Sequence, residues 1–227
     1  MFFVHLMKTQ RMILDILFPN RCLSCNTLID GSKVLCSICL DGIHFTHHQF
    51  GQPNEVTERC KSLFPIEFGV AMMHFENQNL SRKIVHQLKY GAREKIGKEL
   101  AFWAFDLFDW KSNAFDLLVS IPMHPKKQRQ RGYNQLHLFT ETLSKLTQIP
   151  LQHDVLKRTQ FGKAQALKSK NQRGENTGLF EIQTKIENKH ILLLDDVLTT
   201  GNTISQAAWE LLQHQNNKIS VLVFALD

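Results

Sequence analysis

The chain has 227 residues, of which 43% are hydrophobic and 21% charged, and its formal net charge is +6. This length suffices for one or two globular domains with a sizeable core. The composition excludes a collagen, a coiled coil and a wholly disordered chain. No stretch reaches the roughly 18 consecutive apolar residues of a membrane span, so we expect none. The excess of lysine and arginine favours phosphates, nucleic acid or an acidic membrane surface as partners, or a solvated basic surface without a partner.

The beginning of the chain does not resemble a secretory signal, because residues 1–6 are apolar but no basic region precedes them. We therefore expect a cytoplasmic protein, with Met1, Met7 or Met12 as the initiating residue. Thiols stay reduced in that compartment, so the cysteines are not expected to form disulfides.

Four of the five cysteines form two CxxC pairs, Cys22 with Cys25 and Cys36 with Cys39. Two such turns can place four thiolates around one Zn²⁺ ion, and a site with four protein ligands is structural. Free thiols and a redox-active CxxC are the alternatives, although a redox pair normally stands alone beside a βαβ unit. Cys60 stands apart and is interpreted as a plain thiol.

Two segments flank this zinc-ribbon-like segment, residues 19–48. Residues 1–18 are expected to form a helix, because their apolar residues recur at helical spacing. Residues 49–63 are largely polar and contain glycine and proline, so we interpret them as a linker. Residues 64–227 then form the main domain.

The main domain alternates between predicted strands and helices. Strands are expected over residues 69–74, 115–121, 190–194 and 219–226. Helices are expected over residues 80–90, 96–107, 133–146 and 204–212. Strands separated by helices indicate an α/β fold with a mostly parallel sheet.

The strongest chemical signal is the end of the predicted strand 190–194, where two acids, a threonine- and glycine-containing loop and a helix follow. In chain order the residues are Asp195, Asp196, Val197, Leu198, Thr199, Thr200, Gly201, Asn202 and Thr203. Ligands bind at the carboxyl ends of strands in open α/β sheets. Gly201 permits a tight turn, and successive N–H groups at a helix N-terminus bind anions. The carboxylates can accept hydrogen bonds from vicinal hydroxyls or lie near a metal. We interpret the segment as a sugar-phosphate site; a helix-capping cluster at a strand end is the alternative.

This segment closely resembles the phosphoribosyl pyrophosphate (PRPP) signature of type I phosphoribosyltransferases. The resemblance implies that the Thr/Gly loop holds the ribose 5′-phosphate, that Asp195 and Asp196 hold the ribose hydroxyls, and that Mg²⁺ binds together with the pyrophosphate. It also implies the type I phosphoribosyltransferase fold for the main domain, behind an N-terminal four-Cys zinc finger.

Two further segments agree with that resemblance. In the family a pyrophosphate loop follows a buried strand, and here a basic run follows the loop; the candidate residues are Pro122, Met123, His124, Lys126, Arg129 and Arg131. A polar stretch before the signature resembles a loop that closes over PRPP; its candidates are Arg158, Thr159, Gln165, Arg173 and Asn176. An exposed basic loop and an ordinary surface loop are the respective alternatives.

The combination of motifs resembles the ComF/ComFC family over nearly the whole chain. The motifs are the four-Cys finger, His-Gln-Leu-Lys-Tyr at 86–90, Ile-Pro-Met-His-Pro at 121–125, Arg-Gly-Tyr-Asn-Gln at 131–135 and the PRPP signature. Many members carry an additional cysteine pair; only Cys60 stands in that region here, which argues against a second ribbon zinc. The resemblance implies a role in DNA uptake during natural transformation.

Three functions remain open at this point. The first is handling of single-stranded DNA in the cytoplasm, with the basic run neutralising phosphates and Tyr133 either stacking on a base or packing at a helix start. The second is phosphoribosyl transfer from PRPP to an unidentified acceptor, with release of pyrophosphate. The third is an interaction module in which the finger docks a helicase-like partner.

Overall fold

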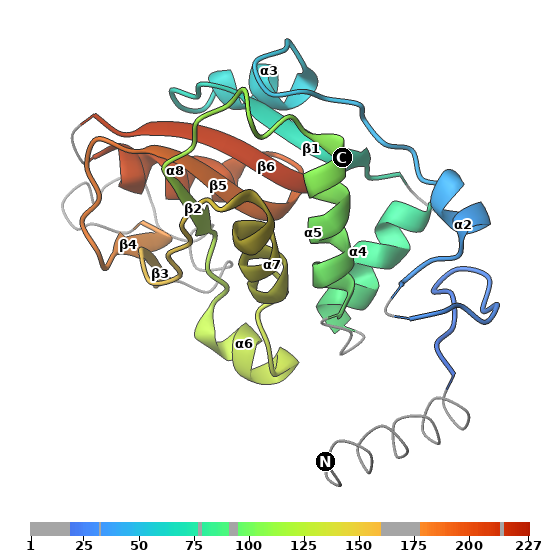
Figure 1. The fold of residues 1–227 in the computed structure, drawn as a ribbon. Coiled ribbons are helices and arrows are strands. Elements are labelled where there is room, and N and C mark those ends of the chain that lie inside the picture. The colour runs from blue at the N-terminus through green and yellow to red at the C-terminus, as the bar shows by residue number, and fades with distance from the viewer. Residues whose placement is uncertain (1–18, 32, 77–78, 91–94, 160–177, 214–215) are drawn as a thin grey trace, which may run out of the picture.

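The computed structural model describes residues 19–31, 33–76, 79–90, 95–159, 178–213 and 216–227 (Figure 1). The predicted N-terminal helix over residues 1–18 lies outside the described residues. Within the described part of the chain, no helix is long and apolar enough to cross a membrane.

The main domain is built on a four-stranded parallel sheet in the order β1-β6-β5-β2. The strands are β1 (Gly69–His74), β2 (Leu117–Ser120), β5 (His190–Leu198) and β6 (Lys218–Leu226). Each predicted strand is present, and the parallel arrangement is confirmed. β5 extends four residues beyond the predicted end at Leu194, because its pairing with β6 continues as far as Leu198.

Helices cover both faces of the sheet (Figure 1). On one face lie α4 (Leu80–Tyr90), α5 (Lys95–Leu107) and α7 (His137–Thr147). On the other lie α3 (Glu55–Lys61) and α8 (Asn202–Leu212). Leu192 and Leu194 of β5 belong to the first apolar core, while Leu193 belongs to the second. The continuous apolar run of β5 is therefore explained by burial on both faces.

Helix α3 corrects the interpretation of residues 49–63 as a linker. The Asn54 side chain caps this helix by accepting a hydrogen bond from the Thr57 N–H, at 3.0 Å. Val56 and Cys60 are fully buried against the sheet. The second half of the segment is therefore part of the main domain, and Cys60 serves as an apolar packing residue.

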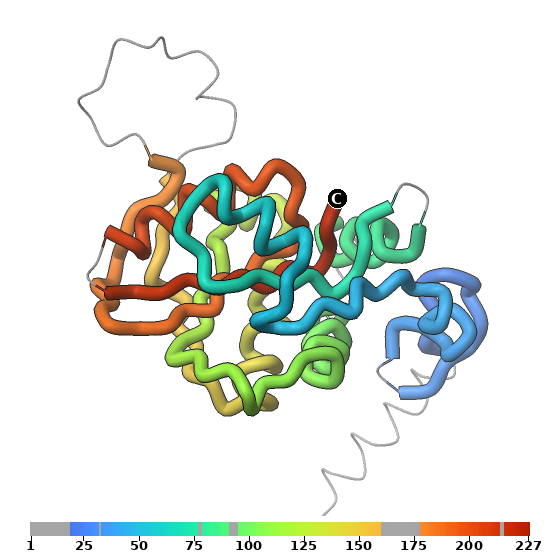
Figure 2. Tube along the Cα trace, turned by 90° about the horizontal axis from the view of Figure 1, so that it is seen from above, coloured from blue at the N-terminus to red at the C-terminus, as the bar shows by residue number. Residues whose placement is uncertain are grey.

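The four-Cys segment, which contains the short helix α2 (Ser37–Asp41), lies at one end of the molecule beside α4 (Figure 2). Its tail runs along the edge strand β1, where Phe45 bridges Met73 in antiparallel fashion. On the other side, Lys83 Nζ of α4 donates a hydrogen bond to the Ser24 carbonyl at 3.2 Å. The finger is thus held against the main domain at two places.

Three further elements differ from the sequence-based expectations. The basic run forms α6 (Pro125–Arg131) and not a loop, and Gly132 ends that helix with φ +80°. As a result, the helix expected from residue 133 begins only at His137. The short strands β3 (Leu156–Arg158) and β4 (Phe180–Ile182) pair as an antiparallel hairpin that was not predicted.

Candidate functional site

The candidate site lies at the carboxyl edge of the sheet, where β2 ends beside Leu194 and β5 continues for four more residues. The Ile121 N–H, just after β2, donates to the Leu194 carbonyl at 2.9 Å. This pairing brings the half-buried residues Pro122, Met123 and His124 next to Asp195 and Asp196 at the end of β5. The predicted pyrophosphate-side loop and the predicted ribose acids therefore lie close together, although Pro122 and Asp195 are 73 positions apart in the sequence. The pairing of β2 with β5 brings them together.

The turn between β5 and α8 has the geometry of an anion-binding loop. Gly201 stands at the N-cap of α8 with φ +76°, in the left-handed region that favours glycine. No side chain caps this helix, and its first turn carries no acidic residue. The N-terminal amides and the helix dipole thus favour an external anion. Thr199, Thr200 and Asn202 are exposed around the turn, and Thr203 is half-buried.

Helix α3 and the residues after it support this loop from behind. Arg59 Nη1 donates hydrogen bonds to the Thr199 carbonyl at 2.8 Å and to the Asp227 carbonyl at 2.6 Å. A Cβ added to Gly201 would lie 2.6 Å from Leu63 Cδ1. Trp209 Nε1 of α8 donates to the Leu63 carbonyl at 3.0 Å. Residues 49–63, which we interpreted as a linker, therefore hold the turn at Gly201 in place.

The two acids at the end of β5 differ in their surroundings. Asp196 is buried, pairs with Lys89 Nζ at 2.9 Å and accepts a hydrogen bond from Gln135 Nε2. Burial, followed by the neighbouring Asp196 carboxylate, raises the pKa of Asp195 to about 7. The positive charges of Lys89 and Arg158 oppose that rise. Two adjacent carboxylates in a partly buried site therefore hold a proton near neutral pH, the usual result of like charges in close contact.

Lys89 and Gln135 are functional candidates that the sequence analysis did not assign to the site. They belong to the motifs at 86–90 and 131–135, and Asp196 joins them. Arg131 extends the network by donating to Gln135 Oε1, with its guanidinium 4.9 Å from the ring centroid of Tyr90. The motifs were visible in the sequence, but nothing in their spacing showed that they meet at one carboxylate.

Tyr133 is a packing residue at this junction. Its hydroxyl donates a hydrogen bond to the Leu88 carbonyl of α4, which ties the turn after α6 to that helix. The side chain is half-buried. Of the two readings of Tyr133, packing at a helix start is therefore the one that the structure supports.

Arg158, in β3 of the hairpin, lies close enough to Asp195 for their charges to interact. Its guanidinium lies 5.4 Å from the ring centroid of Phe180, and its Nε is buried without a hydrogen-bond partner among the described residues. Burial lowers the pKa of Arg158, and the Asp195 charge opposes this effect. Thr159 is fixed nearby by a hydrogen bond from its hydroxyl to the Gly178 carbonyl at 3.0 Å. The other candidates of the closing loop, Gln165, Arg173 and Asn176, lie outside the described residues.

Helix α6 places a group of cations beside the site. Lys126 and Arg129 are exposed, and Arg131 is half-buried in the network described above. His124 caps the helix, with Nδ1 accepting the Lys126 N–H at 3.1 Å. Partial burial and then the cations Lys126 and Arg158 lower the pKa of His124, so the neutral imidazole is favoured.

The four cysteines of the finger fit a metal ion. The Sγ atoms of Cys22, Cys25, Cys36 and Cys39 all lie within 4.8 Å of one another. The Thr27 hydroxyl lies 3.3 Å from Cys25 Sγ, and this hydrogen bond lowers the pKa of Cys25 to about 6, which favours the metal-binding thiolate. Four thiolates at these separations suit one structural Zn²⁺.

Comparison with known families agrees with this division of the chain. Residues 13–63 match the double zinc ribbon domain, and residues 134–226 match the phosphoribosyl transferase domain. Among curated proteins, the chain is 27% identical over 149 residues to DNA utilization protein YhgH of Escherichia coli. It is 28% identical over 95 residues to competence protein F of Haemophilus influenzae and 32% identical over 111 residues to competence protein ComFC of Bacillus subtilis. These relatives and the two domain matches support the ComF family for this chain.

These matches cover only part of this chain and part of each relative. The match to the E. coli protein covers 63% of this chain and 65% of the relative, just under two thirds of its length. The matches to the H. influenzae and B. subtilis proteins cover 40% and 48% of this chain and 42% and 43% of those relatives. Among solved structures, a hypoxanthine phosphoribosyltransferase from Staphylococcus aureus is 19% identical, with a TM-score of 0.32, over 59% of this chain and 62% of that one.

The two domain matches confirm the expected fold class. Its main domain is a type I phosphoribosyltransferase domain with a parallel sheet and flanking helices, and a zinc ribbon with four clustered cysteines precedes it. The match to the double zinc ribbon extends to residue 63, but the last part of it forms helix α3 in this chain. Cys60 lies in that helix and is buried. Burial raises the pKa of Cys60 to about 11, and among the described residues Cys60 belongs to no cluster of side chains that could hold a metal ion.

Proposed function

We propose that this ComF protein binds PRPP at the carboxyl edge of β5 and uses the bound state in the cytoplasmic handling of single-stranded DNA during DNA uptake. PRPP binding is supported by the order of groups along the carboxyl edge of the sheet. The acids Asp195 and Asp196 come first, and the N-terminus of α8, which no side chain caps, follows at Gly201. The acids would accept hydrogen bonds from the ribose hydroxyls, and the loop amides would hold the 5′-phosphate. The pyrophosphate, together with Mg²⁺, would face the cations of α6.

Calorimetry tests PRPP binding directly. The zinc-loaded full chain is titrated with PRPP, with and without Mg²⁺, and ribose 5-phosphate serves as the ligand that lacks the pyrophosphate. We expect micromolar binding of PRPP that strengthens with Mg²⁺, and weaker binding of ribose 5-phosphate. Equal affinity for the two ligands would contradict the role of the α6 cations, and absence of binding to either would remove the PRPP proposal.

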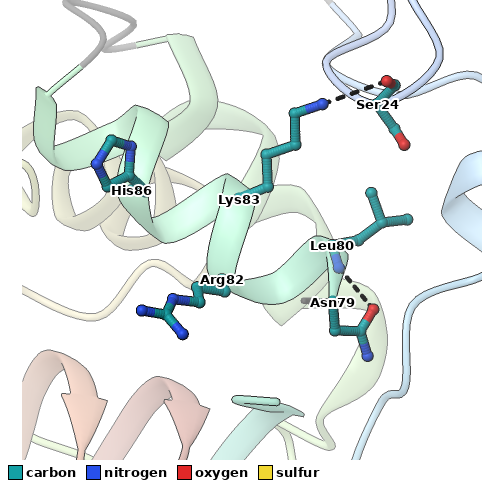
Figure 3. Close-up of a pocket in the computed structure, with 6 residues that line it drawn as sticks. All are labelled: Ser24, Asn79, Leu80, Arg82, Lys83 and His86. Carbon is teal, nitrogen blue, oxygen red and sulfur yellow. Dashed lines mark hydrogen bonds between the residues drawn. The ribbon is translucent and has the colours of Figure 1, made fainter. Parts of the chain in front are cut away.

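A path for single-stranded DNA is supported by the surface of α4. A cavity of about 530 Å³ lies between this helix and the finger. Of the residues that line it, Lys83 reaches Ser24, and Arg82 and His86 project from the same helix (Figure 3). One turn further along α4, Tyr90 is 66% exposed, with the His86 ring 5.0 Å from its own. A single strand of DNA that runs along this helix would contact the cations first and then an aromatic ring on which a base can stack.

The path continues from Tyr90 to α6. The Arg131 guanidinium lies over the Tyr90 ring, and beyond it the exposed side chains of Lys126 and Arg129 line the helix. Cations interleaved with an exposed aromatic ring are typical of sequence-tolerant binding of single strands. The name of the E. coli relative, a DNA utilization protein, and the names of the two competence proteins agree with this partner.

Two variants separate stacking from charge in that path. Binding of a labelled oligonucleotide is followed by fluorescence anisotropy over a series of salt concentrations. Tyr90→Ala should weaken binding by about tenfold, the worth of one stacked base, without changing the salt slope. Arg129→Gln should lower the slope by about 0.7, the value for one phosphate contact on a single strand.

Phe102→Ala is the matched control, because Phe102 is an exposed aromatic residue of α5 that lies beside Lys98. It should leave both the affinity and the salt slope unchanged. Equal effects of Tyr90→Ala and Phe102→Ala would refute the path along α4.

Phosphoribosyl transfer to an acceptor is the second candidate function. It is favoured by the position of Arg158, which the β3–β4 hairpin brings close enough to Asp195 for their charges to interact. In this function the pyrophosphate would leave on the side of Lys126 and Arg129. Release of pyrophosphate in the presence of candidate bases or nucleotides decides between transfer and binding alone. If the protein neither transfers the phosphoribosyl group nor binds PRPP, the remaining candidate is an interaction module whose finger docks a helicase-like partner. Affinity capture with the full chain and with a variant that lacks the finger tests this function.

A further inference from the structure

A cluster of two histidines and a glutamate lies outside the site described above. His137 and Glu141 stand one turn apart on α7, and His153 approaches them from the segment that leads into β3. One ligand atom from each of the three residues lies within 4.8 Å of the other two. His137 Nε2 and Glu141 Oε1 are 3.2 Å apart, and the rings of His137 and His153 are 4.5 Å apart at their centroids.

These distances are close to those required by a single bound ion. Zinc holds nitrogen and oxygen ligands at about 2.0–2.2 Å, so two ligands of one tetrahedral ion are separated by roughly 3.4 Å. The His137–Glu141 pair already has that separation. His137 and Glu141 are 54% and 39% exposed, so their side chains can adjust.

We propose that His137, Glu141 and His153 form a binding site for a divalent first-row transition-metal ion, distinct from the four-Cys site. Two imidazoles and one carboxylate suit zinc and its neighbours better than Mg²⁺ or Ca²⁺, which prefer oxygen ligands. Three protein ligands leave a position for water, in contrast to the four thiolates of the finger. This proposal does not rest on PRPP or DNA binding.

The location indicates what the ion would hold together. Leu151 forms a parallel β-bridge with Leu118 of β2. His153 follows two residues later, so it lies toward the carboxyl edge of the sheet, shortly before β3. His137 is the first residue of α7 and stands two positions after Gln135, whose side chain donates a hydrogen bond to Asp196. An ion at this position would connect the start of α7 to the approach of the hairpin that carries Arg158.

Metal counting on the full chain tests this site. The protein is loaded with Zn²⁺, dialysed against a weak chelator and measured by mass spectrometry of the metal. The natural chain is expected to hold two zinc ions, whereas His153→Ala and Glu141→Gln should each hold one. Affinity at the second site should fall at least about tenfold in both variants, since even outer-shell partners of a metal ligand contribute that much.

A matched control lies elsewhere in the chain. His44 and Glu76 form a pair with the same 3.2 Å separation, but no third ligand joins them among the described residues. His44→Ala should therefore leave two zinc ions. Loading with Co²⁺ gives a second readout, because thiolate ligands add intense charge-transfer bands that a nitrogen and oxygen site lacks.

The outcomes separate clearly. Loss of one ion with retained thiolate bands, in a variant with unchanged circular dichroism, supports the site. A single ion in the natural chain, or two ions in every variant, overturns it. If His153→Ala disturbs folding, Glu141→Gln decides, because this side chain is half-exposed and its replacement keeps the same shape.

Discussion

Replacing the two adjacent acids singly by asparagine should change the stability of the folded protein in opposite directions. Asp195→Asn removes a carboxylate whose ionisation the folded structure opposes, since burial and Asp196 raise its pKa to about 7. Asp196→Asn removes the partner of Lys89, 2.9 Å away, and leaves that ammonium half-buried. The two side chains are neighbours and the substitutions are nearly isosteric, so the difference isolates their electrostatic surroundings.

The magnitudes follow from these contacts. A pKa that moves from 3.8 to about 7 corresponds to at most about 4 kcal/mol of unfavourable ionisation above pH 7. Because the two acids are coupled and Arg158 loses a neighbouring charge, we expect Asp195→Asn to stabilise by about 1–3 kcal/mol at pH 8. Asp196→Asn should destabilise by about 2 kcal/mol, between the values for exposed and fully buried ion pairs.

The pH dependence has a definite sign. The folded protein keeps the Asp195 proton up to about pH 7, whereas an unfolded aspartate releases it near pH 3.8. The contribution of Asp195 to stability is therefore complete below about pH 3.8 and is lost as the pH rises through about 7. Urea unfolding measures this loss of stability in the natural chain and in both variants. The measurements run from pH 5 to pH 8, a range that includes the pKa of about 7. Destabilisation by Asp195→Asn at pH 8, or an unchanged pH slope in that variant, would refute this account of the acid pair.

Three other perturbations follow from the structure. Gly51→Ala and Gly201→Ala both place a side chain at φ +76°, which should cost about 1 kcal/mol of folding free energy. Gly201→Ala should cost more, because its Cβ would lie 2.6 Å from Leu63 Cδ1 whereas a Cβ at Gly51 meets no atom within 4 Å, and calorimetry should find weaker PRPP binding only for Gly201→Ala. Arg59→Ala removes the donor to two carbonyls behind the loop, so denaturant unfolding should show a loss of about 1–3 kcal/mol and PRPP affinity should fall; unchanged affinity would exclude a supporting role. Cys36→Ser should abolish zinc binding at the finger while a separate calorimetric unfolding transition of the main domain persists, and loss of both together would show that the two units fold as one.

The parallel sheet and the turn at Gly201 after β5 were predictable because their signals are local. The run from His190 to Leu194 is continuous and apolar, which requires burial on both faces, and the acids and the glycine follow it directly. The two CxxC pairs are equally local, since their spacing alone brings four thiolates together. In each case the interacting groups are neighbours in the chain or lie on one element.

Other features escaped prediction for identifiable reasons. Helix α3 buries only Val56, Thr57 and Cys60, too few apolar positions to show a helical period. The strands β3 and β4 have three residues each, and pairing alone defines them. The contacts of Asp196 with Lys89 and Gln135 join residues far apart in sequence, so only the folded chain reveals them.

Helix α4 connects the finger to the acid pair in a way that has a thermodynamic consequence. Near its start Lys83 holds the finger, and near its end Lys89 holds Asp196, with less than two helical turns between them. Any influence of zinc loading on ligand affinity that passes through this helix must be matched by an equal influence of the ligand on zinc affinity. Measuring zinc retention in the presence of PRPP therefore reports on the finger and on the acid pair at once, without a mutation in either.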